Sequence, residues 1–259
     1  MMNLFSLKNK VILITGALGG IGEAIVDLFV EYNATVILSD INQVKLKERQ
    51  NDFQLQGKIV DIFPADLSHD EDINNLIAYI STKYSQIDSL VFCSGVEGAC
   101  KSHTNLDFDN VKKILDINLI SAVKLANLLI PIMESNQPIG GSLTFISSIA
   151  SIRGNKSLGI YGVSKAALNQ LVRNIAVEFG PFNIRANSIL PGLIETPLAK
   201  NLMANQQFME RRLLATPLRR VGQAYEVASI ALLLASDAGA FITGQNIVVD
   251  GGTTISDGN

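Results

Sequence analysis

Short apolar runs alternate with amphipathic segments along most of the chain. Runs of five to seven residues, rich in Val, Ile, Leu and Phe, predict buried strands at 10–14, 34–38, 59–63, 87–93, 141–147 and 184–190. Between these runs, apolar positions recur at helical spacing, which predicts a helix from about Ile21 and further helices at about 42–55, 70–83, 108–134 and 160–179. Alternating strands and helices of these lengths imply right-handed crossovers and a parallel sheet covered on both faces. We therefore predict an α/β fold with a doubly wound, Rossmann-like parallel sheet of about seven strands.

No linker, low-complexity tract or internal repeat interrupts this pattern. Residues 1–259 are therefore predicted to form one domain, because α/β folds of this length are often built around a single large core. Within it, residues 193–215 are predicted to be a helical lid.

Glycine or aspartate follows four of the predicted strands. These residues are Gly16, Asp40, Asp66 and Gly95. The carboxyl ends of parallel strands share one edge of a sheet, and ligands of doubly wound folds bind in the crevice outside that edge. Four such strand ends facing one crevice predict a binding site there.

The first of these strand ends carries the segment Thr-Gly-Ala-Leu-Gly-Gly-Ile-Gly at 15–22. Glycines let a backbone turn tightly and approach a pyrophosphate, whose charge is then met by the free amides at the start of the following helix. A plain glycine-rich loop is the alternative interpretation. The strand before the turn and the helix after it favour a dinucleotide site.

Asp40 follows the second strand, about twenty residues after the glycines. A carboxylate there can accept hydrogen bonds from the ribose hydroxyls of adenosine and would repel a 2′-phosphate, which selects NAD(H) over NADP(H). Asp40 could also cap the next helix, and the two roles are compatible. The nearest basic residue is Lys45, so no cation beside Asp40 favours NADP(H).

Tyr161 and Lys165 lie four residues apart in a predicted helix, so they share one helix face. A cation beside a phenol favours the phenolate, and we expect Lys165 to lower the Tyr161 pKa toward the range of a general acid/base. Ser148 follows the fifth strand, and Asn118 lies among apolar neighbours on a helix. Taken alone, Ser148 is a helix or turn cap and Asn118 a hydrogen-bonded core residue.

The composition is that of an ordinary compact protein, with 47% hydrophobic and 17% charged residues. The net charge is −3 and no segment carries a Lys/Arg cluster, which argues against nucleic-acid binding. Polar residues interrupt the most apolar long run, 117–132, so it predicts a buried helix and no membrane span. The N-terminal residues show no secretory signal, and a cytoplasmic location is expected.

Cys93 and Cys100 do not form a disulfide framework, and no Cys/His spacing resembles a metal site, so no metal is expected. Both thiols are predicted to be inert.

Over essentially its whole length the chain resembles the short-chain dehydrogenase/reductase family in its compact single-domain form. The matching motifs are Thr-Gly-x-x-x-Gly-x-Gly at 15–22, Asn118, Ser148, Tyr161-x-x-x-Lys165, Pro191-Gly192-Leu193-Ile194-Glu195-Thr196, and the closing segments 241–245 and 249–252. The glycine spacing and short length argue against the extended sugar epimerase branch. The Tyr-x-x-x-Lys spacing argues against enoyl reductases with a wider spacing.

The resemblance implies a catalytic tetrad of Asn118, Ser148, Tyr161 and Lys165. Tyr161 would exchange a proton with the substrate oxygen, Ser148 would hydrogen-bond that oxygen, Lys165 would hold the nicotinamide ribose, and Asn118 would position a relay water. The expected cofactor is NAD, and the substrate is a small-molecule secondary alcohol or ketone. Cofactor contacts are expected from Gly16, Leu18, Gly20, Ile21, Gly22, Asp40, Ile41, Asp66, Leu67, Ser94, Gly95, Tyr161, Lys165, Pro191, Gly192, Ile194 and Thr196.

One segment departs from the family pattern. The family commonly has Asn-Asn-Ala-Gly after the fourth strand, whereas this chain has Phe92-Cys93-Ser94-Gly95. The glycine that lets the cofactor pass is kept, and the asparagine side chains that brace neighbouring backbone are absent. Ser94 can still donate a hydrogen bond.

The identity of the substrate is left open by the sequence. Candidate lining segments are 96–103, 149–158 and the lid, where an apolar set including Met203 and Phe208 could close the site or simply pack. His103, alone in a loop, is expected to be solvated.

Two alternatives to this function also remain. A 3-oxoacyl-carrier-protein reductase using NADPH is similar over 187–252, although Asp40 and the acidic net charge count against it. The second alternative is a catalytically silent regulator or scaffold, and the complete tetrad argues against it. The resemblance further implies a homotetramer, or a homodimer, assembled through the wide apolar faces of the helices at 108–134 and 160–179.

Overall fold

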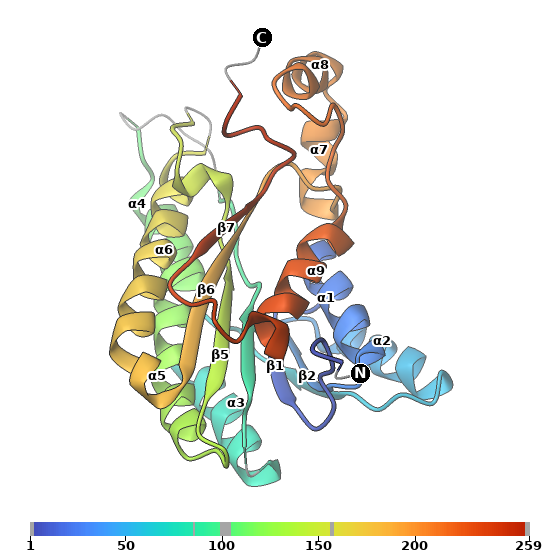
Figure 1. The fold of residues 1–259 in the computed structure, drawn as a ribbon. Coiled ribbons are helices and arrows are strands. Elements are labelled where there is room, and N and C mark those ends of the chain that lie inside the picture. The colour runs from blue at the N-terminus through green and yellow to red at the C-terminus, as the bar shows by residue number, and fades with distance from the viewer. Residues whose placement is uncertain (1–2, 85, 99–104, 156–157, 257–259) are drawn as a thin grey trace.

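A seven-stranded, fully parallel sheet forms the middle layer of the protein in a computed structural model (Figure 1), which describes residues 3–84, 86–98, 105–155 and 158–256. The strand order is β3-β2-β1-β4-β5-β6-β7. The strands are β1 (Val11–Thr15), β2 (Thr35–Asp40), β3 (Asp61–Pro64), β4 (Ser89–Phe92), β5 (Gly141–Ile146), β6 (Ile184–Pro191) and β7 (Asn246–Val249). The order reverses direction at β1 and β4, which confirms the predicted doubly wound fold.

Helices cover both faces of the sheet. One face carries α1 (Gly20–Glu31), α2 (Gln43–Leu55) and α9 (Ala224–Ala235), and the other carries α3 (Asp70–Lys83), α4 (Phe108–Leu115), α5 (Ser121–Glu134) and α6 (Ile160–Phe179). Each face has its own hydrophobic core. Along β1, Ile12 and Ile14 pack into the core under α1 and α9, whereas Val11 and Leu13 pack into the core under α3 and α5. This alternation explains why buried parallel strands are continuous apolar runs.

The third strand begins later than its apolar run predicts. Ile59 is 84% exposed, and pairing with β2 starts only where Ile37 lies opposite Asp61. The predicted strand at 59–63 is therefore wrong at its first two residues, because β-branched side chains favour a strand only where a partner strand is present.

The predicted helix at 108–134 is one continuous rod with a change of winding in the middle. A π-helical segment, Asp116–Ile120, joins α4 to α5 and contains the fully buried Asn118. The rod is long and apolar enough for a membrane span, but Leu125, Leu129 and Met133 belong to the core beneath the sheet. Its apolarity is thus accounted for by packing within the domain.

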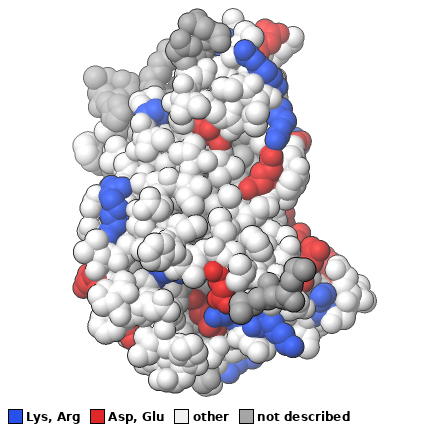
Figure 2. Space-filling model, viewed as in Figure 1, with Lys and Arg blue, Asp and Glu red and all other residues white. Residues whose placement is uncertain are grey.

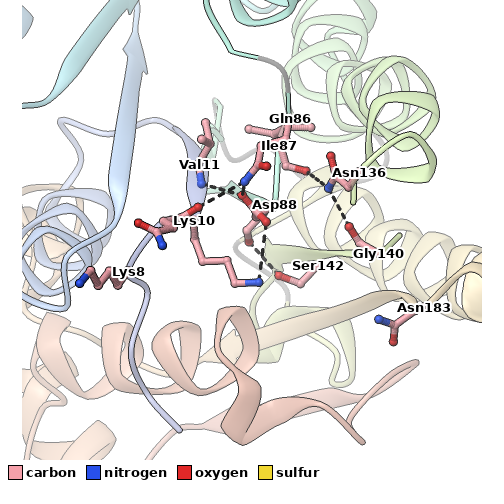
Figure 3. A network of polar contacts seen from close by, with 12 residues as sticks. Lys8, Lys10, Val11, Gln86, Ile87, Asp88, Asn136, Gly140, Ser142 and Asn183 are labelled. Atoms are coloured by element: carbon pink, nitrogen blue, oxygen red, sulfur yellow. Dashed lines mark hydrogen bonds and ion pairs between the residues drawn. The ribbon is translucent and has the colours of Figure 1, made fainter. Parts of the chain in front are cut away.

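Polar side chains hold the amino end of the sheet together (Figure 3). The Asp88 carboxylate accepts hydrogen bonds from Val11 N and Gln86 Nε2, both at 2.8 Å, and lies 3.7 Å from Lys10 Nζ. Asn136 Nδ2 donates to the carbonyls of Ile87 and Gly140, also at 2.8 Å. The amino end of the sheet is therefore occupied by structural bonding, and the carboxyl end is left for ligands.

The predicted lid consists of short helices. A 3-10 turn (Pro197–Ala199) leads into α7 (Lys200–Met203) and α8 (Gln206–Leu214), which stand beyond the carboxyl ends of the strands (Figure 1). Asn205 caps α8 by accepting from Phe208 N at 2.9 Å. Most of the face shown in Figure 2 is neither basic nor acidic, and its charged side chains form a few small groups.

Candidate active site

The glycine turn between β1 and α1 is closed too tightly for any larger residue. Gly16 has φ +61°, and a Cβ there would lie 2.8 Å from Ser94 N. A Cβ on Gly22 would lie only 2.1 Å from the Gly16 carbonyl oxygen. No side chain caps the start of α1, so its first amides face the turn. This is the cradle that a phosphate needs.

Asp40 lies at the end of β2 with its carboxylate turned toward the glycine turn. Its Oδ2 accepts from Leu18 N at 3.2 Å, and its Oδ1 accepts from Asn42 N at 3.3 Å. A carboxylate has about four acceptor sites, so it can still accept hydrogen bonds from a ribose diol. The alternative role of Asp40 as the cap of the next helix is wrong, because α2 is capped by Asn42, whose Oδ1 accepts from Lys45 N at 3.1 Å.

The rest of the predicted cofactor set also lies along the carboxyl edge. Asp66 was expected to contact the cofactor. Its Oδ1 instead accepts hydrogen bonds from Ser68 N and Oγ at 2.9 and 2.7 Å, which stabilise the local turn. Leu67 is buried and Ile41 exposed. At the far side, Gly192 lies against Asp250, and Thr196 lies against Gly20, where a Cβ would meet its Cγ2 at 2.8 Å. The glycine turn therefore contacts Thr196, at the start of the lid.

These features fit a dinucleotide. The turn excludes side chains, the helix start offers amides, and Asp40 offers a diol acceptor. Two buried hydroxyls at the adjoining strand ends, those of Thr15 and Ser39, have no hydrogen-bond partner in the structure. Among the described residues, no group of His, Cys, Asp or Glu is placed to hold a metal ion.

Ser148 and Tyr161 come together above the end of β5. The Ser148 hydroxyl hydrogen-bonds the Tyr161 phenol and also accepts from Ala150 N at 3.1 Å. Ser148 is held there because the 3-10 turn Ile149–Ser151 starts directly after it. The two hydroxyls can converge on one substrate oxygen.

Lys165 and Asn118 both lie close to Gly95. A Cβ on Gly95 would be 3.1 Å from Lys165 Nζ and 3.4 Å from Asn118 Oδ1. Lys165 is 3% exposed and donates to the Ile146 carbonyl at 2.8 Å. The four residues of the predicted tetrad are thus brought together around the ends of β4 and β5.

Asn118 braces the loop that follows β4. Its Oδ1 accepts from Val96 N at 2.8 Å, and its Nδ2 donates to Val96 O and Ser164 Oγ at 2.9 and 3.0 Å. The buried amide is therefore satisfied, as expected. This bonding supplies bracing in a loop that lacks the family's asparagines. The role of Asn118 in holding a relay water stays a prediction.

The pKa of Tyr161 is raised, whereas we expected Lys165 to lower it. Burial, and after it the Glu97 carboxylate, raise the pKa to about 12, while the hydrogen bond from Ser148 opposes them. Lys165 does not lower it, because its Nζ lies 5.7 Å from the Tyr161 ring centroid and is directed to the Ile146 carbonyl. Burial also lowers the pKa of Lys165 to about 8. The phenol is thus set as a proton donor at neutral pH.

Glu97 is the charged site residue that the sequence did not single out. It lies two residues beyond Gly95, inside the segment 96–103 named as lining, and burial raises its pKa. Its position just after a strand end was the available signal. His103 and Cys100 fall outside the described residues. Burial raises the pKa of the Cys93 thiol to about 12, in keeping with an inert role.

We predict that Glu97→Gln lowers the Tyr161 pKa. A carboxylate nearby disfavours the phenolate, so removing its charge favours deprotonation. Alcohol oxidation needs the phenolate, so its rate should rise with pH. In Glu97→Gln this rise should occur roughly half to one pH unit lower than in the wild type. Glu178→Gln removes the same charge from an exposed position on α6 and should leave the profile in place. An unshifted profile for Glu97→Gln would show that Glu97 does not act on the phenol.

A hollow of about 430 Å³ adjoins the site. It lies between residues 150–155 and the first turns of α6, and its lining includes Arg153, Val163 and Ala166. Neither Ser148 nor Tyr161 lines it, so the hollow does not contain the proton donor.

Comparisons with known proteins agree over almost the whole chain. A family model described as enoyl-(acyl carrier protein) reductase matches residues 16–254. A tropinone reductase homolog of Arabidopsis thaliana is 35% identical over 252 residues, which cover 97% of this chain and 95% of the relative. The match therefore spans both the glycine turn and the tetrad.

Solved structures match equally widely. A 7α-hydroxysteroid dehydrogenase complexed with NADH and 7-oxo glycochenodeoxycholic acid has a TM-score of 0.91 and 33% identity, covering 97% of this chain and 98% of that one. A gluconate 5-dehydrogenase from Burkholderia cenocepacia in complex with NADP and tartrate has a TM-score of 0.93 and 26% identity, covering 98% of each chain. The two neighbours differ in cofactor.

Proposed function

The chain belongs to the short-chain dehydrogenase/reductase family and is an oxidoreductase, and on that premise we propose that it transfers a hydride between NAD(H) and a secondary alcohol or ketone. The observation that carries the proposal is the Ser148–Tyr161 hydroxyl pair, held beside Lys165 at the same sheet edge as the glycine turn and Asp40. A proton donor and a dinucleotide cradle in one crevice are what carbonyl reduction requires.

The protein's part in this reaction is to bind the oxygen and move a proton. The nicotinamide, when bound, supplies the hydride to the carbonyl carbon or accepts it from the carbinol carbon. Ser148 hydrogen-bonds the substrate oxygen and stabilises the negative charge that develops on it. Tyr161 donates its proton to that oxygen during reduction and takes it back during oxidation.

The raised Tyr161 pKa favours the reducing direction. A phenol with a pKa of about 12 is protonated at neutral pH, so the donor is ready without a prior ionisation step. Once the proton has left, the phenolate keeps the hydrogen bond from Ser148, which favours the ionised form. Oxidation needs the phenolate first and should therefore be faster at alkaline pH.

Asp40 supports NAD(H) as the cofactor. Its carboxylate would repel a 2′-phosphate, and in the described part of the chain its hydrogen-bond donors are the backbone N–H groups of Leu18 and Asn42 and no cationic side chain. We expect kcat/KM for NADH to exceed that for NADPH in the wild type. Asp40→Ala should reduce this ratio roughly tenfold or more, the effect of about 1.4 kcal/mol of lost discrimination.

The measurement is the initial rate of ketone reduction with each cofactor across a panel of oxo acids, sugars, steroids and cyclic ketones. Asp40→Asn keeps the shape and one acceptor, so it separates charge from contact. Asp52→Ala, an exposed carboxylate on α2, is the matched control. A wild type that prefers NADPH would refute the cofactor assignment. If neither NADH nor NADPH supports reduction of any ketone in the panel, the catalytically silent regulator becomes the better explanation of the protein's function.

A second candidate is a 3-oxoacyl-carrier-protein reductase using NADPH. The match to a family model whose description names acyl carrier protein favours it. Rapid reduction of acetoacetyl thioesters with NADPH, exceeding that of any simple ketone with NADH, would select this candidate. The homotetramer and the cytoplasmic location stay predictions.

A further inference from the structure

A chain of hydrogen bonds starts at the backbone of Ser148 and leads away from the tetrad. The Ser148 carbonyl accepts from Ser151 N at 3.0 Å and from Ser151 Oγ at 2.5 Å. Ser151 Oγ in turn accepts from Asn169 Nδ2 at 2.8 Å. Asn169 lies on α6, about one turn after Lys165 and two turns after Tyr161. Its amide therefore links the helix that carries Tyr161 and Lys165 to the turn that follows Ser148.

The orientation of the Asn169 amide is fixed from both sides. Because Ser151 Oγ gives its proton to Ser148, only a donor can face it, and so the amide nitrogen points to Ser151. The amide oxygen points to the sheet, where Ser188 Oγ in β6 lies 3.1 Å from Asn169 Oδ1 and 2.6 Å from Asn246 Oδ1 in β7. Asn169 is 3% exposed and Ser188 fully buried, so these bonds offset the cost of burying the amide.

Three successive residues at the end of β5, 146–148, are joined to α6 by side-chain hydrogen bonds. Lys165 Nζ donates to the Ile146 carbonyl at 2.8 Å, and Ser147 Oγ donates to the Lys165 carbonyl at 3.0 Å. Ser148 is the third, and it is joined through the chain just described. The first two links hold the end of the strand against the helix, and the third holds the residue that carries the catalytic hydroxyl.

The position of the Ser148 hydroxyl depends on the turn that these bonds hold. Its Oγ accepts from Ala150 N at 3.1 Å, within the turn that Ser151 closes, and hydrogen-bonds the Tyr161 phenol. Two hydroxyls can bind one substrate oxygen only while their separation and directions are kept, and a misplacement of about 1 Å can cost roughly 10²-fold in rate. A bond that fixes the turn therefore also fixes the catalytic geometry.

We propose that Asn169 is a positioning residue for the reaction: acting through Ser151, it holds the Ser148 hydroxyl so that this hydroxyl and the catalytic phenol bind the same carbonyl oxygen. The inference rests on the proposed function and adds to it a residue outside the tetrad. Because Asn169 acts through Ser148, its side chain should matter for catalysis only while the Ser148 hydroxyl is present.

The test is a double-mutant cycle on kcat, with NADH and the ketone of the panel that the wild type reduces fastest. Ser148→Ala should lower kcat roughly 10²- to 10³-fold, the effect of removing one donor to a developing oxyanion. Asn169→Ala keeps that hydroxyl but loosens it, so kcat should fall roughly ten- to a hundredfold while the KM for NADH stays within about twofold. In the Ser148→Ala background the same substitution should change kcat by less than about twofold, because the group on which it acts is gone. Equal losses in the two backgrounds would mean a general structural role for Asn169 and would overturn the proposal.

Asn174→Ala is the matched control, because it removes an amide from the exposed face of α6, where Asn174 accepts from Gln170 Nε2 at 2.8 Å. It should behave like the wild type. If Asn169→Ala does not fold, Ser151→Ala interrupts the same chain at a half-buried position. It should also lower kcat in the wild type and leave it unchanged in the Ser148→Ala background.

A measurement without turnover separates this inference from the proposed function. The carbon NMR resonance of Tyr161 Cζ, assigned by its loss in Tyr161→Phe, reports the hydrogen bond between the phenol and Ser148. Asn169→Ala should move this resonance in the same direction as Ser148→Ala, and Asn174→Ala should leave it in place. If this pattern is seen but no ketone is reduced, the hydride-transfer proposal fails and the positioning role stands. A resonance that stays in place in Asn169→Ala would overturn the positioning role, whether or not ketones are reduced.

Discussion

Replacing Tyr161 by Phe is expected to lower kcat for ketone reduction roughly 10²- to 10⁴-fold, the contribution that a positioned general acid makes. The substitution removes only the phenolic hydroxyl, so the substrate oxygen loses its proton donor and Ser148 loses one partner. The glycine turn and Asp40 are untouched. NADH affinity, measured by quenching or enhancement of its fluorescence, should therefore stay within about twofold of the wild type, since no direct contact of the adenosine half has changed.

The control is Tyr225→Phe, which removes a phenolic hydroxyl from a side chain on α9 that is 64% exposed. It should behave like the wild type in both assays. Turnover that persists in Tyr161→Phe would mean that another group, or water, supplies the proton. Loss of NADH affinity in Tyr161→Phe would instead mean that the variant disturbs the crevice more widely than the single hydroxyl.

Substituting Gly22 by Ala is expected to remove dinucleotide binding almost completely. The new methyl would lie 2.1 Å from the Gly16 carbonyl oxygen, which is a backbone atom and cannot rotate away, so the turn itself must open. The first amides of α1 would then no longer point at the phosphate position. We also expect a loss of folding stability of about 1–3 kcal/mol, as for other overpacked sites.

Gly180→Ala is the matched control. Nothing lies within 4 Å of its Cβ position. Because Pro181 follows its αR backbone, Ala costs some stability there, but the substitution leaves the glycine turn and NADH affinity unchanged. NADH titration and thermal unfolding of both variants give the comparison. A Gly22→Ala protein that binds NADH as tightly as the wild type would show that the turn does not carry the phosphates.

The parts of the fold that depend on local pattern could be predicted from the sequence. The buried strands of a parallel sheet are continuous apolar runs, and α3 and α6 lie where their periodicity placed them. The start of β3 could not be predicted, because Ile59 and Val60 have strand-forming side chains but no opposing strand. The π segment was also missed, since a change of winding leaves the apolar spacing on both sides intact.

For the site, the residue types were predictable and their electrostatics were not. The spacing of Tyr161 and Lys165 gave their common face correctly. It could not show that Lys165 would donate to Ile146, or that Glu97 would act on the phenol from another element. Interactions between distant segments depend on tertiary packing, which no short motif records.

The most direct test of hydride transfer is to reduce a ketone with NADH that carries deuterium at both hydrogens of the nicotinamide C4 and to locate the label by mass spectrometry. We predict deuterium on the carbinol carbon of the product with the wild-type protein, and little labelled product with Tyr161→Phe despite bound NADH. An alcohol product without the label, or equal labelling with Tyr161→Phe, would contradict it.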